Sequence, residues 1–333
     1  MKALALSVLL LLCMACARAP EELQISGNTM GTQFTVKLAG YDANIEGLQQ
    51  EIEASLDAVN LMMSTYKADS EISRFNSNAT TEWQPVSAEF CASVKSALAL
   101  SALTNGAFDI TVGPLVNLWG FGPGDTIDEP PADADIAALL LLIGYEHLQA
   151  DCSRPALRKD IVELVLDMSA FGKGYAADRV ADELEDAGID DYLVEIGGEL
   201  RVAGHNADGK RWAVGIEAPL SDQRRPHGVI RLTDAAVATS GDYRNYFEFG
   251  GQRYSHTIDT RTGKPVTHSL ASVTVVDDSG ARADALATAF LVMGPENAIA
   301  FALKEQLAAM FLLRSNAGTK ELTTPAFDQL RSN

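Results

Sequence analysis

Residues 160–203 read DIVELVLDMSAFGKGYAADRVADELEDAGIDDYLVEIGGELRVA, and this stretch decides the fold class. It changes from an apolar run to helical periodicity, and then to short β-forming runs separated by Gly and Asp. Parallel βαβ proteins alternate more strictly than this. The pattern predicts a strand at 160–166, a helix at 171–187 that ends before Gly188, and strands at 192–196 and 200–203.

The rest of the chain shows the same mixture of short strands and helices. Apolar and alternating runs predict strands at 32–38, 211–216, 228–232, 272–276 and 309–313, the last of which closes the fold. Helical spacing predicts helices at 45–59, 89–103, 135–142, 284–292 and 296–305, and Gly, Pro and Asp predict a loop at 113–131. We therefore predict an α+β fold in which mixed or antiparallel sheets pack with helices in one catalytic unit.

The first residues have the composition of an export signal. Lys2 is followed by an apolar run at 3–12, which is too short to remain as a transmembrane helix. Residues 15–17 fit both a bacterial lipobox, although Cys13 stands where Leu is usual, and an ordinary cleavage site. We favour lipidation at Cys16, which would anchor the protein on the periplasmic side of a bacterial membrane. The predicted segments are a signal peptide at 1–16, a tether at 17–26 and a catalytic domain at 27–333.

The net charge is −19 at pH 7, and removal of the signal would make it one unit more negative. A protein this acidic repels nucleic acid and anionic lipid, so we expect no nucleic-acid partner and membrane contact only through the lipid anchor. An anionic ligand would need a local metal ion, a helix N-terminus or backbone N–H groups. Cys91 and Cys152 could form a disulfide after export or stay as two buried thiols. No cysteine or histidine spacing is typical of a zinc site.

Asp284 and Thr288 are four residues apart on a predicted helix and therefore share one face. A carboxylate beside a hydroxyl supplies the hard oxygen ligands that Mg²⁺ prefers. The same two residues could also be ordinary parts of the helix. Asp284 would then be stabilised by the helix dipole, and the Thr288 hydroxyl would bond back to its own helix. Taken alone, the spacing favours that simpler interpretation.

Three further segments carry residues suited to binding or catalysis. Residues 167–175, DMSAFGKGY, place two glycines at the start of a predicted helix, where backbone N–H groups can meet phosphate. Their spacing is not that of a Walker A or Rossmann motif, and a plain strand–turn–helix joint has the same pattern. His256, near the end of a strand, could be a general base or a histidine satisfied by local hydrogen bonds. Tyr66 ends the first long helix and could stack on a flat ring or cover the edge of the core.

The order of these and other motifs along the chain resembles the ApbE family, the FAD:protein FMN transferases. The resemblance runs from about Gly27 to the last predicted strand. The segments that carry it are 29–32 (TMGT), 63–66 (MSTY), 70–76 (SEISRFN), 106–111 (GAFDIT), 167–178 (DMSAFGKGYAAD), 195–199 (EIGGE), 238–243 (ATSGDY), 256–265 (HTIDTRTGKP) and 283–288 (ADALAT).

The resemblance implies roles for individual residues. Asp284 and Thr288 match the family's Mg²⁺ ligands, together with the backbone carbonyl of Ala170. His256 matches the proposed general base. Ala287 stands where some members carry an extra acidic ligand, so the metal would be held by fewer carboxylates here. The residues that match the lining of the family's FAD site are Met30, Tyr66, Ala107, Phe108, Asp109, Asp167, Lys173 and Ile258.

The resemblance also implies the reaction, with FAD as the substrate. Mg²⁺ would bridge the FAD diphosphate, and His256 would take the proton of a Thr or Ser hydroxyl that attacks the FMN-side phosphorus. The products would be a covalently flavinylated protein and AMP. The expected acceptor is a redox protein with a D-x-x-[ST]-G-A-[ST] motif, such as a subunit of a sodium-pumping quinone reductase or a related electron-transport complex.

Two alternatives use the same residues differently. With water as the nucleophile, the site would belong to an Mg²⁺-dependent FAD pyrophosphatase that yields FMN and AMP. A lipoprotein that binds FAD without chemistry would keep the ring-stacking residues but would not need Asp284, Thr288 or His256. The presence of all three argues against this second alternative.

Overall fold

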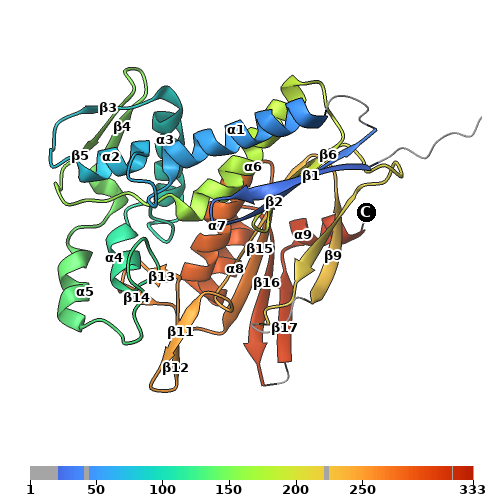
Figure 1. Ribbon diagram of the computed structural model, residues 1–333. Helices are drawn as coiled ribbons and strands as arrows, with labels where there is room; N and C mark the ends of the chain where they lie inside the picture. Colours follow the sequence, from blue (N-terminus) through green and yellow to red (C-terminus); the bar gives the residue numbers. More distant parts are fainter. Residues whose placement is uncertain (1–21, 41–44, 221–224, 317, 333) are drawn as a thin grey trace, which may run out of the picture.

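An eight-stranded antiparallel sheet forms the centre of the molecule (Figure 1). The computed structural model describes residues 22–40, 45–220, 225–316 and 318–332. The strand order is β1-β2-β6-β7-β10-β15-β16-β17, and every neighbouring pair is antiparallel. The strands are β1 (Glu22–Thr29), β2 (Thr32–Ala39), β6 (Tyr192–Ile196), β7 (Glu199–Ala203), β10 (Ala235–Gly241), β15 (Leu270–Asp277), β16 (Ala308–Ser315) and β17 (Gly318–Thr323).

Both faces of the sheet are covered, which explains why β15 is buried along nearly its whole length. On one face, α1 and α6 pack over the β1–β2–β6 end, and α7 and α8 pack over β15 and β16. On the other face lie the hairpin β8–β9 and the last helix, α9. These elements are α1 (Ile45–Met63), α6 (Ser169–Asp186), β8 (Trp212–Glu217), β9 (Pro226–Leu232), α7 (Gly280–Met293), α8 (Pro295–Lys304) and α9 (Pro325–Ser332).

Helices α6 and α7 touch backbone to backbone, because each carries a glycine where they meet. A Cβ atom on Gly174 would lie only 2.1 Å from the carbonyl oxygen of Gly280. The Asp178 carboxylate of α6 accepts hydrogen bonds from the N–H groups of Gly280 and Ala281 at the start of α7, at 2.7 and 3.1 Å. Asp284 of α7 accepts one from the Gly174 N–H of α6 at 3.2 Å. The two helices therefore fix each other's position.

The other described elements form two smaller groups beside these helices (Figure 1). The first group is α2 (Glu71–Ser77), β3 (Gln84–Pro85), α3 (Ala88–Leu103), η1 (Tyr145–His147), β4 (Leu148–Asp151) and β5 (Ala156–Lys159). The second group is α4 (Gly113–Leu118), α5 (Asp133–Leu140), β11 (Tyr246–Phe249), β12 (Gln252–Ser255), β13 (Ile258–Asp259) and β14 (Lys264–Pro265). This second group surrounds Trp119, whose indole N–H donates to the carbonyl of Gly263 at 2.7 Å.

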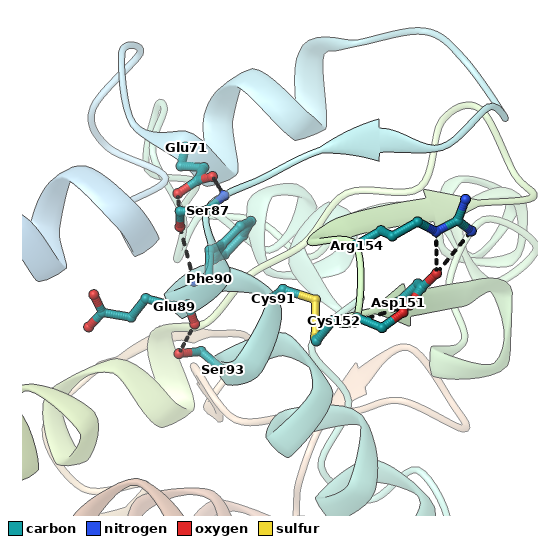
Figure 2. The surroundings of a disulfide bond; sticks show 10 residues. Glu71, Ser87, Glu89, Phe90, Cys91, Ser93, Asp151, Cys152 and Arg154 are labelled. Atoms are coloured by element: carbon teal, nitrogen blue, oxygen red, sulfur yellow. Dashed lines mark hydrogen bonds and ion pairs between the residues drawn. A yellow bond between two sulfur atoms is a disulfide. The ribbon is translucent and has the colours of Figure 1, made fainter.

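A disulfide joins Cys91 and Cys152, a pairing that the sequence left open. Figure 2 shows Cys91 in the first turn of α3 and Cys152 beside Asp151, in the turn that follows β4. The start of the same helix is held by Ser87, whose hydroxyl accepts the Phe90 N–H at 3.1 Å. The bond therefore ties α3 to the β4–β5 hairpin.

The predicted strand at 160–166 is wrong, and the true strand, β5, ends at Lys159. Side chains bind several backbone groups of this segment, and the Leu164 N–H donates to the Ile161 carbonyl in a local turn at 3.1 Å. The fully buried Lys159 ammonium donates to the carbonyl of Leu164 at 3.0 Å. Asn76 pairs with both backbone groups of Leu166, at 2.8 and 2.9 Å. An apolar run alone does not distinguish such a buried, side-chain-braced segment from a strand.

Four other expectations need correction. Residues 22–26 belong to β1 rather than to a tether, and the remainder of the predicted tether lies outside the described residues, as do the signal segment and Cys16. The predicted loop at 113–131 contains α4, which begins at Gly113-Pro114, a usual place for Pro. The predicted helix at 135–142 starts two residues earlier, as α5. The strand at 309–313 does not close the fold, because β17 and α9 follow it. None of the described helices has the length and apolarity needed to cross a bilayer.

Removal of the disulfide should destabilise the protein. The bond spans 61 residues, so its loss in a Cys91→Ser/Cys152→Ser variant should lower the free energy of unfolding by about 4 kcal/mol. Urea unfolding measures this difference. Reductant should shift the wild-type protein to the same midpoint and leave the variant unchanged; equal midpoints for the two oxidised proteins would contradict the prediction.

The contact between α6 and α7 predicts opposite effects for two neighbouring glycines. Gly174→Ala forces the helices apart and should cost about 1–3 kcal/mol of stability. Gly172→Ala is the matched control, because a Cβ there meets nothing within 4 Å. It should leave stability unchanged or raise it by up to about 1 kcal/mol. Thermal unfolding of both variants makes the comparison, and a stable Gly174→Ala protein would refute the account of the helix contact.

Candidate active site

A cleft of about 1370 Å³ opens between the end of α1, the start of α6, the side of α7 that carries Asp284 and Thr288, and the segment around His256. A volume of this size exceeds that of ordinary drug-sized sites and suits a large ligand such as a dinucleotide. Every residue that the sequence singled out for the site lines this cleft: Met30, Tyr66, Ala107, Phe108, Asp109, Asp167, Ala170, Lys173, His256, Ile258, Asp284 and Thr288. Residues far apart in the chain therefore meet in one place.

Three charged side chains form a cluster on the cleft floor where α6, α7 and β7 meet. The Lys173 ammonium lies 3.2 Å from Glu199 Oε1 and 3.8 Å from Asp284 Oδ2. Both carboxylates are almost completely buried, at 5% and 2% exposed. Burial alone would lower the pKa of Lys173, but the two nearby carboxylates, Asp284 first, raise it above its usual range. Lys173 is therefore a permanent positive charge in an acidic protein.

Three oxygen donors, one of which is Asp284 of this cluster, could hold a metal ion. Asp284 and Thr288 lie one turn apart on α7, and the Thr288 hydroxyl is 2.8 Å from the Ser240 hydroxyl. Ala170 has non-helical backbone angles at the start of α6. The Gly174 N–H, which a regular helix would direct at the Ala170 carbonyl, donates to Asp284. Ala170 lines the cleft at this point.

This donor set fits a hard divalent cation such as Mg²⁺, which takes oxygen ligands from few protein groups and completes its shell with water or phosphate. The fit depends on a single carboxylate. Within the described ranges, no three His, Cys, Asp or Glu side chains are arranged around a common metal position. Ala287 is fully buried in the apolar core between α7 and the sheet, so no acid comes from that position.

His256 is held by a contact between one ring nitrogen and a backbone carbonyl. Its Nδ1 lies 3.1 Å from the backbone carbonyl of Asn245, and this contact favours the tautomer in which Nδ1 carries the proton. Nε2 is then the acceptor. Phe121 packs edge-on against the ring at 6.3 Å between centroids. Burial lowers the pKa of His256, and Lys173 adds to this effect against the Asn245 contact, so the ring is neutral at pH 7.

Two aspartates of the cleft form hydrogen bonds that stabilise its walls. Asp109 Oδ1 accepts the N–H and the hydroxyl of Thr111, both at 2.8 Å, and Oδ2 accepts the Tyr145 N–H at 3.0 Å. Burial raises the pKa of Asp109 despite these donors. Asp167 Oδ1 accepts the Ser169 N–H at 2.8 Å and thereby shapes the turn into α6. Both acids line the cleft mainly as structural groups.

The apolar residues of the cleft differ in exposure. Phe108 and Ile258 are buried and form part of the wall, as does Ala107. Tyr66 is 70% exposed at the rim, where its ring can cover a ligand. Met30 sits in the β1–β2 turn with a positive φ of 49°, which directs this turn into the cleft.

The sequence assigned no role to Glu199 or Ser240, which the structure brings into the cleft. The available signal was their place in the segments 195–199 and 238–243. Spacing could not reveal that Glu199 turns inward after the Gly197-Gly198 turn to meet Lys173. Burial raises the pKa of Glu199 above its usual range, whereas the nearby Lys173 ammonium favours the ionised carboxylate and opposes this shift.

Residues 30–311 match the model of the ApbE family. The chain belongs to the ApbE family. Among curated relatives, the FAD:protein FMN transferase of Vibrio cholerae is 46% identical over 320 residues, which cover 96% of this chain and 95% of that protein. The Escherichia coli K12 protein of the same name is 39% identical and covers 94% of this chain and 90% of its own length.

Solved structures of ApbE proteins have the same fold. The flavin transferase ApbE from Vibrio cholerae superposes with a TM-score of 0.87 at 43% identity, covering 93% of this chain and 99% of that one. The apo flavinyl transferase ApbE of Pseudomonas stutzeri gives 0.86 at 41% identity, covering 94% and 98%. The α+β fold, the family and the enzyme class that the sequence predicts, a transferase, are therefore confirmed for this ApbE chain.

Proposed function

We propose that this chain is an Mg²⁺-dependent FAD:protein FMN transferase that moves the FMN half of FAD to a Thr or Ser hydroxyl of another protein and releases AMP. The observation that carries the proposal is the convergence of all the predicted site residues on one cleft of about 1370 Å³. Membership of the ApbE family, whose relatives are named flavin transferases, also supports the flavin chemistry.

The charged cluster suits the diphosphate of FAD. Asp284, Thr288 and the Ala170 carbonyl would hold Mg²⁺, and the Lys173 ammonium, 3.8 Å from Asp284, would lie close to the phosphate oxygens. When bound, Mg²⁺ would neutralise phosphate charge and make the phosphorus more electrophilic. Gly172 at the start of α6 lines the cleft without a side chain, so the backbone is accessible there, where helix N–H groups favour anions. These groups offset the negative charge of the rest of the molecule.

His256 is the group suited to activate the acceptor. With Nδ1 committed to Asn245, the neutral ring can take a proton at Nε2 from the incoming hydroxyl. The hydroxyl oxygen then forms a bond to the FMN-side phosphorus, and the bond from that phosphorus to the AMP oxygen breaks. AMP leaves, and the flavin remains on the acceptor through a phosphoester. Tyr66 at the rim would cover the flavin ring by stacking.

The acceptor and the place of action follow from chemistry outside the cleft. We propose an acceptor that carries the D-x-x-[ST]-G-A-[ST] motif, such as a subunit of a sodium-pumping quinone reductase. We further propose that the chain acts on the periplasmic side of the membrane, anchored through a lipid on Cys16. The Cys91–Cys152 disulfide supports this location, because disulfides persist in oxidising compartments.

Metal removal tests the proposal directly. A motif-bearing acceptor incubated with FAD, Mg²⁺ and the protein should gain a fluorescent flavin that stays attached in a denaturing gel, and EDTA should prevent it. Asp284→Asn should abolish transfer because it removes the one carboxylate of the metal site. Asp57→Asn is the matched control, since Asp57 is an exposed carboxylate that also lines the cleft.

The outcomes of this assay separate the alternatives. Free FMN with no labelled acceptor would identify a pyrophosphatase, and tight FAD binding without turnover would identify a binding protein. Transfer that persists in EDTA, or in Asp284→Asn, would refute the metal assignment.

The pKa of His256 predicts how transfer depends on pH. The base works only when neutral, so activity should be constant near neutral pH and fall as the pH drops through the lowered pKa of His256, below 6.5. His256→Ala should slow transfer by about 10²–10⁴-fold and abolish this acidic limb, while FAD affinity changes little. Rate–pH profiles and FAD fluorescence titrations measure the two effects. An equal loss of rate and affinity would instead indicate a structural role.

A further inference from the structure

Glu199 is a buried carboxylate to which no role has been given. It starts β7 directly after the Gly197-Gly198 turn and is 5% exposed. Its Oε1 lies 3.2 Å from the Lys173 ammonium. Its Oε2 is buried and finds no hydrogen-bond partner among the residues that the structure describes. Because an unpaired buried charge is unfavourable, Glu199 depends on Lys173 for most of its neutralisation.

Lys173 has two possible anions within reach and lies nearer to Glu199. The distance from its nitrogen is 3.2 Å to Glu199 but 3.8 Å to Asp284. If Glu199 were absent, Asp284 would be the remaining carboxylate of the cluster, and the Lys173 ammonium could form an ion pair with it. An ammonium paired with Asp284 would compete with a metal ion for the same oxygens. Glu199 therefore determines whether Asp284 is available to a metal ion.

We propose that Glu199 is a positioning residue that holds the Lys173 ammonium away from Asp284, so that Asp284 remains open to a divalent cation. This inference rests on the proposed function, because it takes Asp284 as the metal ligand. The three side chains together carry one negative charge, which favours the arrival of a cation. Once a divalent ion is bound, Lys173 still has Glu199 as its partner and no buried charge is left unpaired.

The proposal predicts an interaction between two substitutions. Binding of Mn²⁺, used as an EPR-visible probe, is measured on the mature protein without FAD. Glu199→Gln should weaken binding about tenfold, because the ammonium now pairs with Asp284. Lys173→Met should bind Mn²⁺ at least as tightly as the wild type. In the Lys173→Met/Glu199→Gln protein the competing ammonium is gone, so affinity should return to within about threefold of the wild type.

Two control variants accompany the series. Glu195→Gln alters a nearby cleft carboxylate whose Oε1 accepts the Gly198 N–H at 2.7 Å, a bond that the amide oxygen of Gln retains. It should leave Mn²⁺ affinity within about threefold of the wild type. Asp284→Asn should abolish high-affinity binding.

The results distinguish failure of this inference from failure of the proposed function. Unchanged affinity in Glu199→Gln would overturn the inference, as would a double variant as weak as Glu199→Gln alone, since Glu199 would then act on the metal directly or through the fold. In both cases Asp284→Asn would still lose Mn²⁺. If Asp284→Asn binds Mn²⁺ like the wild type, or the wild type binds none, the metal assignment fails and the inference falls with it.

Discussion

The backbone contact between α6 and α7 is the constraint on which the rest of the site depends. Gly174 and Gly280 let the helices approach so closely that a side chain on either would meet the backbone of the other. The contact is reinforced in both directions, since Asp178 binds the start of α7 and Asp284 binds the N–H of Gly174. A carboxylate that would be costly to bury alone is thereby fixed at the start of another helix, where the dipole favours negative charge.

That arrangement addresses the electrostatic difficulty of this protein. A chain with a net charge of −19 repels an anionic dinucleotide unless positive charge is concentrated locally. Lys173 supplies one permanent positive charge. The oxygens of Asp284, Thr288 and Ala170 are suited to bind a metal ion, which would supply further positive charge. The same ammonium helps to keep His256 neutral, so binding and base chemistry share one electrostatic origin.

Local patterns in the sequence predicted helices and strands well where one face is buried, because apolar residues then recur at a regular interval. The alternation at 32–38 and the helical spacing at 45–59 correspond to β2 and α1. Patterns failed where side chains replace the usual backbone partners, as Lys159 and Asn76 do along 160–166. Strand β1 was missed because its eight residues carry few apolar side chains, and only Ile25 is buried deeply among them.

The site residues were predicted through the family resemblance rather than through spacing. Asp284 and Thr288 alone favoured an ordinary helix, and no local pattern shows that Glu199 at the start of β7 contacts Lys173 of α6. That contact depends on the pairing of β6 with β7 and on α6 packing above them, which are long-range features. The disulfide is of the same kind, because two cysteines 61 residues apart reveal their pairing only in the folded chain.

The most direct measurement of the central claim is an anomalous diffraction map of crystals grown with FAD and Mn²⁺. The account predicts one strong peak about 2.1 Å from an Asp284 carboxylate oxygen, the Thr288 hydroxyl and the Ala170 carbonyl, in contact with the FAD diphosphate. A bound dinucleotide with no peak at Asp284, or with its diphosphate far from Lys173, would contradict it.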